Sequence, residues 1–228
     1  MKLSPSTIEY IDRVTSVAQL AGIDAIVFRK DVVSGKDDVP SVLLIQKEGI
    51  PDFEFDELAV IRVPYFRQRM DAIRSSNGAF TFDYDPQVGM VTFSAGRSKA
   101  EYRAGNALAV RPPKGLADQD RFQFSVDADF TTLISRAASA YPSKDPIIVF
   151  TSSGTEVEIS ITDDEAGDSF TSVVSSDLQG DGALSVRYSL KTLLPLLKQH
   201  ESTTLKVSAK GILSLSIRGI HILLIPRV

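Results

Sequence analysis

The stretch Ile61-Arg62-Val63-Pro64-Tyr65 decides the fold, because Val186-Arg187-Tyr188-Ser189-Leu190 repeats its pattern about 125 residues later. Each stretch leads into an amphipathic helical pattern. The alternating segment that follows the first helix, 79–85, and the one that follows the second, 204–210, keep the same offset. The repeat predicts two similar domains in one chain, an architecture that suits an extended or symmetric partner.

The composition agrees with two domains. Lys2-Leu3-Ser4 and Phe124-Ser125-Val126-Asp127 each precede a further helical pattern, so the likeness runs through both halves. With 228 residues and 43% hydrophobic content, the chain can bury two cores of about 115 residues each. Cysteine is absent, which excludes disulfides and thiolate metal sites, and no apolar run has the length of a signal peptide or membrane span. We expect a soluble, intracellular protein with no membrane partner.

Periodicity predicts an α+β fold in which each half packs two helices on curved, mostly antiparallel sheets. The expected helices are 5–21, 64–75, 128–141 and 189–200. The expected strands are 23–29, 41–46, 53–63, 79–84, 90–94, 99–104, 121–126, 146–151, 155–162, 168–176, 183–188, 203–209, 212–218 and 220–226. The expected domains are 1–106 and 120–228, joined by a linker, 107–119, that holds the only adjacent proline pair.

Two helices have clear apolar stripes. Phe66, Met70 and Ile73 recur at helical spacing and should be buried. The fourth helix should bury the leucines at positions 190, 193, 194 and 197.

Charge is distributed unevenly between helices and the rest of the chain. The formal net charge is -4, which alone argues against a simple nucleic-acid binder. The four expected helices nevertheless sum to +3 and the remainder to -7. The helix cations are Arg13, Arg67, Arg69, Arg74, Arg136, Lys191 and Lys198. Such residues often form only the solvated face of a helix, but their concentration on the helices leaves a nucleic-acid partner open.

No motif indicates catalysis or a cofactor. Asp163-Asp164-Glu165 with Asp168 lacks the glycine and ligand spacing of a calcium loop and indicates an exposed turn. Neither His200 nor His221 has a second ligand at metal-binding spacing, so both are interpreted as structural or exposed. Gly180-Asp181-Gly182 is typical of a turn rather than of a phosphate-binding loop. We expect no enzyme activity, metal or cofactor.

Several stretches resemble the DNA polymerase sliding clamps of the proliferating-cell-nuclear-antigen type, and more closely the short clamps of tailed phages. They are Phe124 to Phe130 with the following helix, Val157 to Asp164, Val186 to Leu190 and the ending Leu224-Ile225-Pro226-Arg227. The opening Met1-Lys2-Leu3-Ser4 also looks like a phage clamp. The resemblance covers the whole chain in order and length, and is weaker by residue in the first half.

The resemblance implies a non-enzymatic processivity factor. Three copies would form a ring whose twelve helices line a hole for duplex DNA, with the helix cations above contacting phosphates without reading bases. Partners would be a DNA polymerase and an ATP-dependent clamp loader, in the host cytoplasm if a phage encodes the protein. The partner-peptide pocket would use Leu108, Val110, Pro112, Ile225, Pro226 and Val228. The subunit interface would pair 99–104 with 169–174 of the next copy, with Lys99, Tyr102, Ala104, Ser169, Phe170 and Val174 at the contact.

Three alternatives remain open on sequence alone. One is a β-rich ring or virion assembly protein with no DNA in its centre. Another is a processivity factor that acts on open DNA as a monomer or dimer. An enzyme with a site formed between subunits is the third, and no motif supports it.

Overall fold

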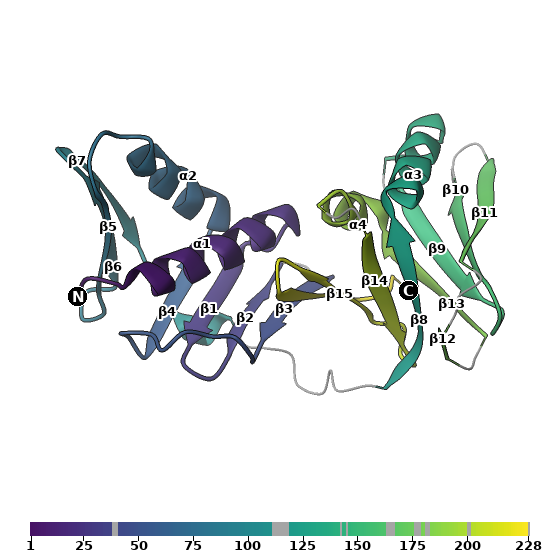
Figure 1. The fold of residues 1–228 in the computed structure, drawn as a ribbon, viewed down its shortest axis with the longest axis horizontal. Helices are drawn as coiled ribbons and strands as arrows, with labels where there is room; N and C mark the ends of the chain where they lie inside the picture. Colours follow the sequence, from purple (N-terminus) through teal and green to yellow (C-terminus); the bar gives the residue numbers. More distant parts are fainter. Residues whose placement is uncertain are drawn as a thin grey trace. The chain divides into compact units, whose positions relative to one another are not determined.

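The computed structural model describes residues 1–37, 41–110, 119–141, 143–144, 146–162, 167–175, 179–180, 183–199 and 202–227. The chain divides into two compact units, Met1–Pro113 (unit 1) and Lys114–Val228 (unit 2). In the described residues, each unit contains two α-helices and antiparallel strands, which confirms the α+β fold class (Figure 1). The division falls inside the expected linker 107–119. Its first residues form a short 3-10 helix, η1 (Ala107–Ala109), and residues 111–118 lie outside the described part.

Unit 1 runs from helix to strands twice. Its elements are α1 (Pro5–Leu20), β1 (Ala25–Arg29), β2 (Val33–Lys36), β3 (Val42–Gln46), β4 (Glu57–Ile61), α2 (Val63–Arg74), β5 (Phe80–Asp85), β6 (Met90–Ala95) and β7 (Ser98–Arg103). The first four strands pair in the order β3-β2-β1-β4, and the last three form a separate sheet, β5-β6-β7.

Helix α1 is fixed at both ends by its own sequence. The Ser4 hydroxyl accepts a hydrogen bond from the backbone N–H of Thr7 at 3.3 Å, and Pro5 occupies the first turn, where it loses no helical hydrogen bond. The carboxylate of Glu54 also accepts from the Ser4 N–H and the Thr7 hydroxyl, both at 2.9 Å. The helix ends before Gly22, whose φ of 73° is the left-handed conformation that glycine adopts readily.

Helix α2 packs over an aromatic core. Phe66, Met70 and Ile73 are buried, as the periodicity predicted. The Phe66 ring meets the rings of Phe93 and Tyr102 edge-on, with centroids 5.3 and 5.1 Å apart. Burying these large side chains stabilises the packing of α2 on the sheet β5-β6-β7.

Unit 2 repeats the alternation of helix and strands, with an additional strand before its first helix and an additional short strand between its two helices. It contains β8 (Asp120–Asp127), α3 (Ala128–Ala140), β9 (Ile147–Ser152), β10 (Val157–Thr162), β11 (Ser169–Ser175), β12 (Gln179–Gly180), β13 (Leu184–Ser189), α4 (Leu190–Leu197), β14 (Ser202–Ser208), β15 (Leu213–Ile217) and β16 (Ile220–Leu224). One set of strands runs β12-β8-β14-β15-β16 and the other β11-β10-β9-β13.

Helix α4 is short and buries a different set of leucines from the one predicted. Leu190, Leu193 and Leu197 are buried, but Leu194 is half-buried and Leu196 takes the fourth core position. Pro195 lies inside this helix of eight residues. Since Leu193 and Leu197 are four apart and Leu196 is three beyond Leu193, the buried stripe follows the same helical face.

Three local expectations about strands were wrong. Strand β2 was not predicted, yet it pairs with both β1 and β3. Residues 53–56 are not a strand; Phe53 and Phe55 are buried, and their rings stack on each other with centroids 4.8 Å apart. Gly180, expected in a turn, instead forms strand β12 with Gln179 and pairs with β8, whereas Asp181 and Gly182 lie outside the described residues.

Candidate nucleic-acid interface

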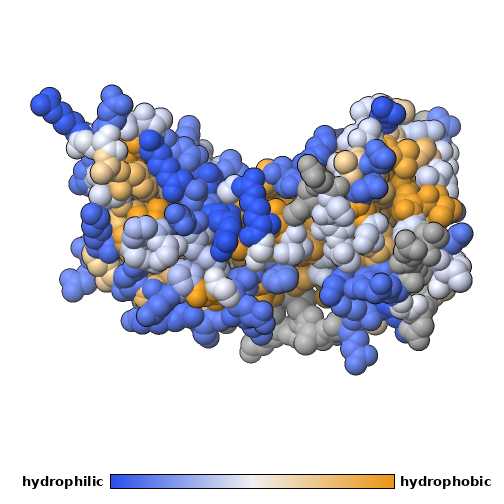
Figure 2. Space-filling view, in the orientation of Figure 1, coloured by the Kyte–Doolittle hydropathy of each residue, from blue (hydrophilic) through white to orange (hydrophobic). Residues whose placement is uncertain are grey.

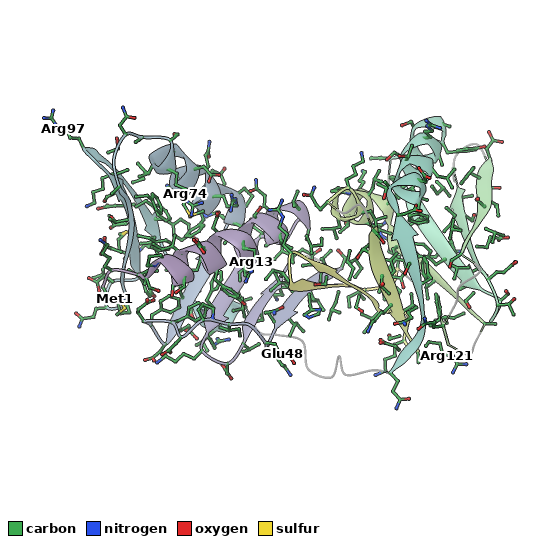
Figure 3. The ribbon with its side chains drawn as sticks, viewed as in Figure 1. Met1, Arg13, Glu48, Arg74, Arg97 and Arg121 are labelled. Carbon is green, nitrogen blue, oxygen red and sulfur yellow. The ribbon has the colours of Figure 1, made fainter. Side chains whose placement is uncertain are left out.

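Five of the seven predicted helix cations are exposed. They are Arg13 on α1, Arg69 on α2, Arg136 on α3, Lys191 on α4 and Lys198 at its C-terminal cap. Arg67 and Arg74 are only partly exposed. Figure 3 labels Arg13 and Arg74, which project from the two neighbouring helices of unit 1.

Arg67 and Arg74 meet at one carboxylate, that of Asp12 on α1. Arg67 Nη1 lies 2.7 Å from Asp12 Oδ1, and Arg74 Nη1 lies 2.6 Å from Asp12 Oδ2. We call these three side chains the Asp12 cluster. Partial burial raises the pKa of Asp12, but hydrogen bonds from Arg74 and Arg67 lower it by more, and the pKa lies below its usual value. The carboxylate is therefore charged at neutral pH and neutralises part of the basic surface of unit 1.

Arg13 and Arg69 are held more loosely. The Arg13 guanidinium lies 5.3 Å from the centre of the Tyr10 ring, a cation–π contact. Arg13 and Tyr10 border an open depression of about 510 Å³ with Ser6, Glu9 and residues 49–51. Arg69 donates a long hydrogen bond, 3.4 Å, to the carbonyl of Tyr65 one turn earlier.

In unit 2, Arg136 and Lys198 both line a second, separate depression. This open hollow of about 680 Å³ lies on the outer face of α3 and is lined by Thr131, Thr132, Ser135, Arg136, Ser139, Ala140 and Lys198. Within the described part of the chain, neither cation forms an ion pair, and both are exposed. Hydroxyl groups beside two unpaired cations can bind phosphate oxygens without recognising a base. Lys191 differs, because its Nζ donates to the carbonyl oxygen of Lys144.

Sequence reasoning missed three features of this surface. Asp12 was counted only as a charge, although Arg67 and Arg74, seven residues apart on one helix face, could have suggested a shared partner. Arg62 was not assigned to the site; it caps α2 with a φ of 56°, and its guanidinium lies 5.7 Å from the centre of the exposed Tyr65 ring. The hydroxyl groups around Arg136 gave no periodic signal that would distinguish them from an ordinary solvated face.

Both strands predicted at a subunit interface are edge strands. Among the described strands, β7 pairs only with β6, and β11 pairs only with β10. The opposite edges are partly covered: Leu3 N–H donates to the Phe82 carbonyl of β5 at 2.9 Å, and Arg227 N–H donates to the Arg187 carbonyl of β13 at 2.8 Å. Among the described strands, β7 and β11 therefore each have one edge that no other strand pairs with.

The side chains on these strands differ from expectation at one position. Tyr102 is 3% exposed and faces the interior of unit 1, where its hydroxyl accepts from the Ile61 N–H at 2.8 Å and donates to the Ile61 carbonyl. It is therefore a core residue of unit 1, unlike the exposed position that was expected. Lys99 and Ser169 are exposed, and Ala104, Phe170 and Val174 are partly exposed. Figure 2 shows apolar side chains gathered over the α3, β10 and β11 part of unit 2, where Val173 is 54% exposed.

The predicted peptide-pocket residues lie in different environments. Leu108 on η1 is 69% exposed, whereas Val110 is buried with Val27, Ala59 and Ala107. Ile225 and Pro226 are half-buried. Pro112 and Val228 lie outside the described residues.

The remaining candidate residues add no chemistry to the interface. In the part of the chain that is described, no group of three His, Asp or Glu side chains could hold a metal ion. Asp168 and His221 are exposed, while His200 and residues 163–166 lie outside that part. No helix in the described ranges is long and apolar enough to cross a membrane.

Comparison with known proteins gives structural relatives only. No protein-family profile and no curated protein sequence matches the chain. The A. fulgidus PCNA, solved with the C-terminal region of FEN-1, superposes with a TM-score of 0.69 and 17% identity over 100% of this chain and 99% of that one. The Sulfolobus tokodaii PCNA2–PCNA3 complex gives 0.66 and 16%, again over 100% and 99%.

Bacterial clamps show the same likeness over part of their length. The Bacillus subtilis DNA polymerase sliding clamp matches with a TM-score of 0.69 and 13% identity, over 100% of this chain and 64% of that one. The expected architecture is confirmed: this chain has the DNA clamp fold.

Proposed function

We propose that the protein is a sliding clamp, a non-enzymatic processivity factor that encircles duplex DNA and tethers a DNA polymerase to it. The observation that carries this proposal is the full-length match to the A. fulgidus PCNA, over 100% of one chain and 99% of the other. A clamp needs only weak attraction to DNA, because a closed ring is retained by topology. An overall charge of -4 with exposed cations on the helices fits that requirement.

The copy number that we propose is three. The chain spans the length of PCNA chains but only 62–65% of the bacterial clamp chains. Strand β7 of one copy would pair with β11 of the next, which would give both free edges a partner. The apolar side chains near Val173 would then be covered by the neighbouring copy.

The helix cations are the proposed contacts to DNA. Arg13, Arg69, Arg136, Lys191 and Lys198 would touch phosphates directly, with Arg67 and Arg74 sharing their charge with Asp12. Leu108, the most exposed large apolar side chain of the described residues, would contribute to a site for partner peptides with Val110, Pro112, Ile225, Pro226 and Val228. An ATP-dependent loader would open the ring, and a phage-encoded clamp would act in the host cytoplasm.

The test combines ring retention with polymerase stimulation. The protein, loaded on nicked circular DNA, should co-sediment with it and be lost when the circle is linearised, and its solution mass should be that of a trimer. Retention that is unaffected by linearisation, or a monomeric or dimeric mass, would instead favour a processivity factor on open DNA. Absence of any DNA association would favour an assembly protein.

A charge-matched pair of variants tests the helix surface. Replacing Arg13, Arg69, Arg136, Lys191 and Lys198 with Gln should reduce stimulation of polymerase on primed DNA while the trimer remains. Control replacement of five exposed cations outside the helices, Lys30, Lys47, Arg97, Lys206 and Arg218, changes net charge equally and should have little effect. Equal effects of the two sets would show that total charge, rather than the helix surface, determines stimulation.

A further inference from the structure

In the Asp12 cluster, the two arginines hold the Asp12 carboxylate in the way that they could hold a phosphate group. Two guanidinium groups approach the two oxygens of one carboxylate, Arg67 at Oδ1 and Arg74 at Oδ2. A DNA phosphate likewise presents two charged oxygens, and arginine binds both groups through similar charge-assisted hydrogen bonds. The carboxylate thus occupies donors that would otherwise be available to DNA.

The two arginines are held to different degrees. Arg67 Nη1 also donates to the Asp12 carbonyl at 2.9 Å and to the Thr15 hydroxyl at 3.2 Å, and its side chain is 15% exposed. Arg74 is 30% exposed, and its guanidinium lies 5.0 Å from the centre of the Phe80 ring. Solvent therefore reaches Arg74 more easily, and Arg74 is the group that can exchange Asp12 for a phosphate.

We propose that Asp12 competes with DNA phosphate for Arg74 and Arg67, and thereby keeps the contact between unit 1 and duplex DNA weak. This inference rests on the proposed function, because it assumes that α1 and α2 face DNA. Asp12 is a positioning residue in this scheme: it acts on DNA only through the two arginines. Its consequence is a low friction against sliding, since each additional phosphate contact must break as the protein moves.

The substitution Asp12→Asn removes the negative charge of this side chain and keeps its size and shape. Freeing two guanidinium groups adds up to two phosphate contacts, so the slope of log affinity against log salt should steepen by up to about 1.8. Between about 50 and 200 mM salt, this corresponds to an additional loss of affinity of about tenfold, starting from tighter binding at low salt. Fluorescence anisotropy with a short linear duplex measures this slope without requiring a closed or loaded ring.

Asp71→Asn is the matched control. Asp71 is 54% exposed on α2, and its carboxylate lies 3.6 Å from Arg67 Nη2. The substitution changes net charge by the same amount but leaves both bonds to Asp12 in place, so the slope should change little. Asp12→Glu restores the charge and should return the slope toward that of the wild-type protein.

If Asp12→Asn alone does not fold, a double variant still tests the inference. Combining Asp12→Asn with Arg67→Met removes the less exposed guanidinium together with its partner, so that only Arg74 is freed and the slope should steepen by about 0.9. Thermal unfolding monitors the fold of each variant.

Equal slopes for Asp12→Asn and Asp71→Asn, or an unchanged slope in the double variant, would overturn the inference. Failure of the wild-type protein to remain on circular DNA would overturn the proposed clamp function instead, because the anisotropy measurement does not depend on the ring.

Discussion

Unit 1 and unit 2 share the alternation of helix and strands but hold their helix cations differently. In unit 1, two of the arginines share a carboxylate with hydrogen bonds of 2.7 and 2.6 Å. In unit 2, Arg136 and Lys198 are exposed among hydroxyl groups, with no ion pair among the described residues. The two halves of a duplicated chain can therefore present similar charge to a partner while differing in how much of that charge is available.

In both units, the first and second helices are supported differently. The first helix of each unit has a side-chain cap, Ser4 in α1 and Asp127 in α3, whereas neither second helix has one. The second helices depend instead on their cores, an aromatic one beneath α2 and a leucine stripe along α4. Each of these differences can be tested by substitution.

The largest effect should come from the aromatic core of unit 1. Phe66→Ala removes a fully buried ring that contacts Phe82, Phe93 and Tyr102, and should reduce the free energy of unfolding by about 3–5 kcal/mol. Hydrogen exchange should show loss of protection concentrated in unit 1. Tyr65→Ala, at the exposed neighbouring position, should change stability by less than about 0.5 kcal/mol.

Two buried tyrosines offer the next comparison. Tyr102→Phe leaves both backbone groups of Ile61 without the hydroxyl, whereas Tyr188→Phe leaves only the Gly211 carbonyl, which the Tyr188 hydroxyl reaches at 2.7 Å. Each should cost about 1–3 kcal/mol, with the larger loss for Tyr102→Phe. Chemical denaturation measures both losses of unfolding free energy. A larger loss for Tyr188→Phe would contradict the expectation that the two hydrogen bonds of Tyr102 contribute more stability than the one of Tyr188.

Helix capping should give a smaller difference. Asp127 accepts the Phe130 N–H at 2.8 Å, so Asp127→Ala should cost about 0.5–2 kcal/mol. Ser189→Ala at the start of α4 removes no side-chain cap and should cost less than about 0.5 kcal/mol. Similar losses of stability in the two variants would show that Asp127 contributes no specific cap.

The smallest expected effect is the pH dependence of the stability that the Asp12 ion pairs contribute. Because the pKa of Asp12 is lowered in the folded protein, its ion pairs contribute stability above the unfolded pKa of about 3.9, and this contribution is lost as pH falls through the lower, folded pKa. The stability difference between wild type and Asp12→Asn should be constant above about pH 5 and shrink below about pH 4. It should stay under about 1 kcal/mol, since water reaches the cluster. A difference that grows on acidification would contradict the lowered pKa.

Periodicity in the sequence predicted the helices because their buried stripes are local. The start of α1 follows from Ser4 and Pro5, its end from Gly22, and the core face of α2 from three apolar residues. Strand β2 could not be predicted, since Val33-Ser34-Gly35-Lys36 lacks alternation and is held by strands on both sides. Phe53 and Phe55 have the two-residue spacing that is typical of a strand, but they lie outside the strands and their rings stack on each other.

The site was predictable only as a set of charges. Helical position showed which cations share a helix face, but 55 residues separate Asp12 from Arg67, and nothing local indicates that they meet. Tyr102 was misplaced for the same reason: its partner, Ile61, lies on a strand 41 residues earlier. Long-range pairing of this kind follows from the packed fold and not from spacing.

The free edges at β7 and β11 have one further consequence. They belong to different sheets and carry different side chains, so pairing β7 of one copy with β11 of another joins unlike surfaces. A contact of this kind propagates head to tail and closes into a ring when the rotation between neighbouring copies divides a full turn. Every copy in such a ring would point the same way around, so the ring would have two chemically distinct sides and a partner docked on one side would be oriented along the DNA.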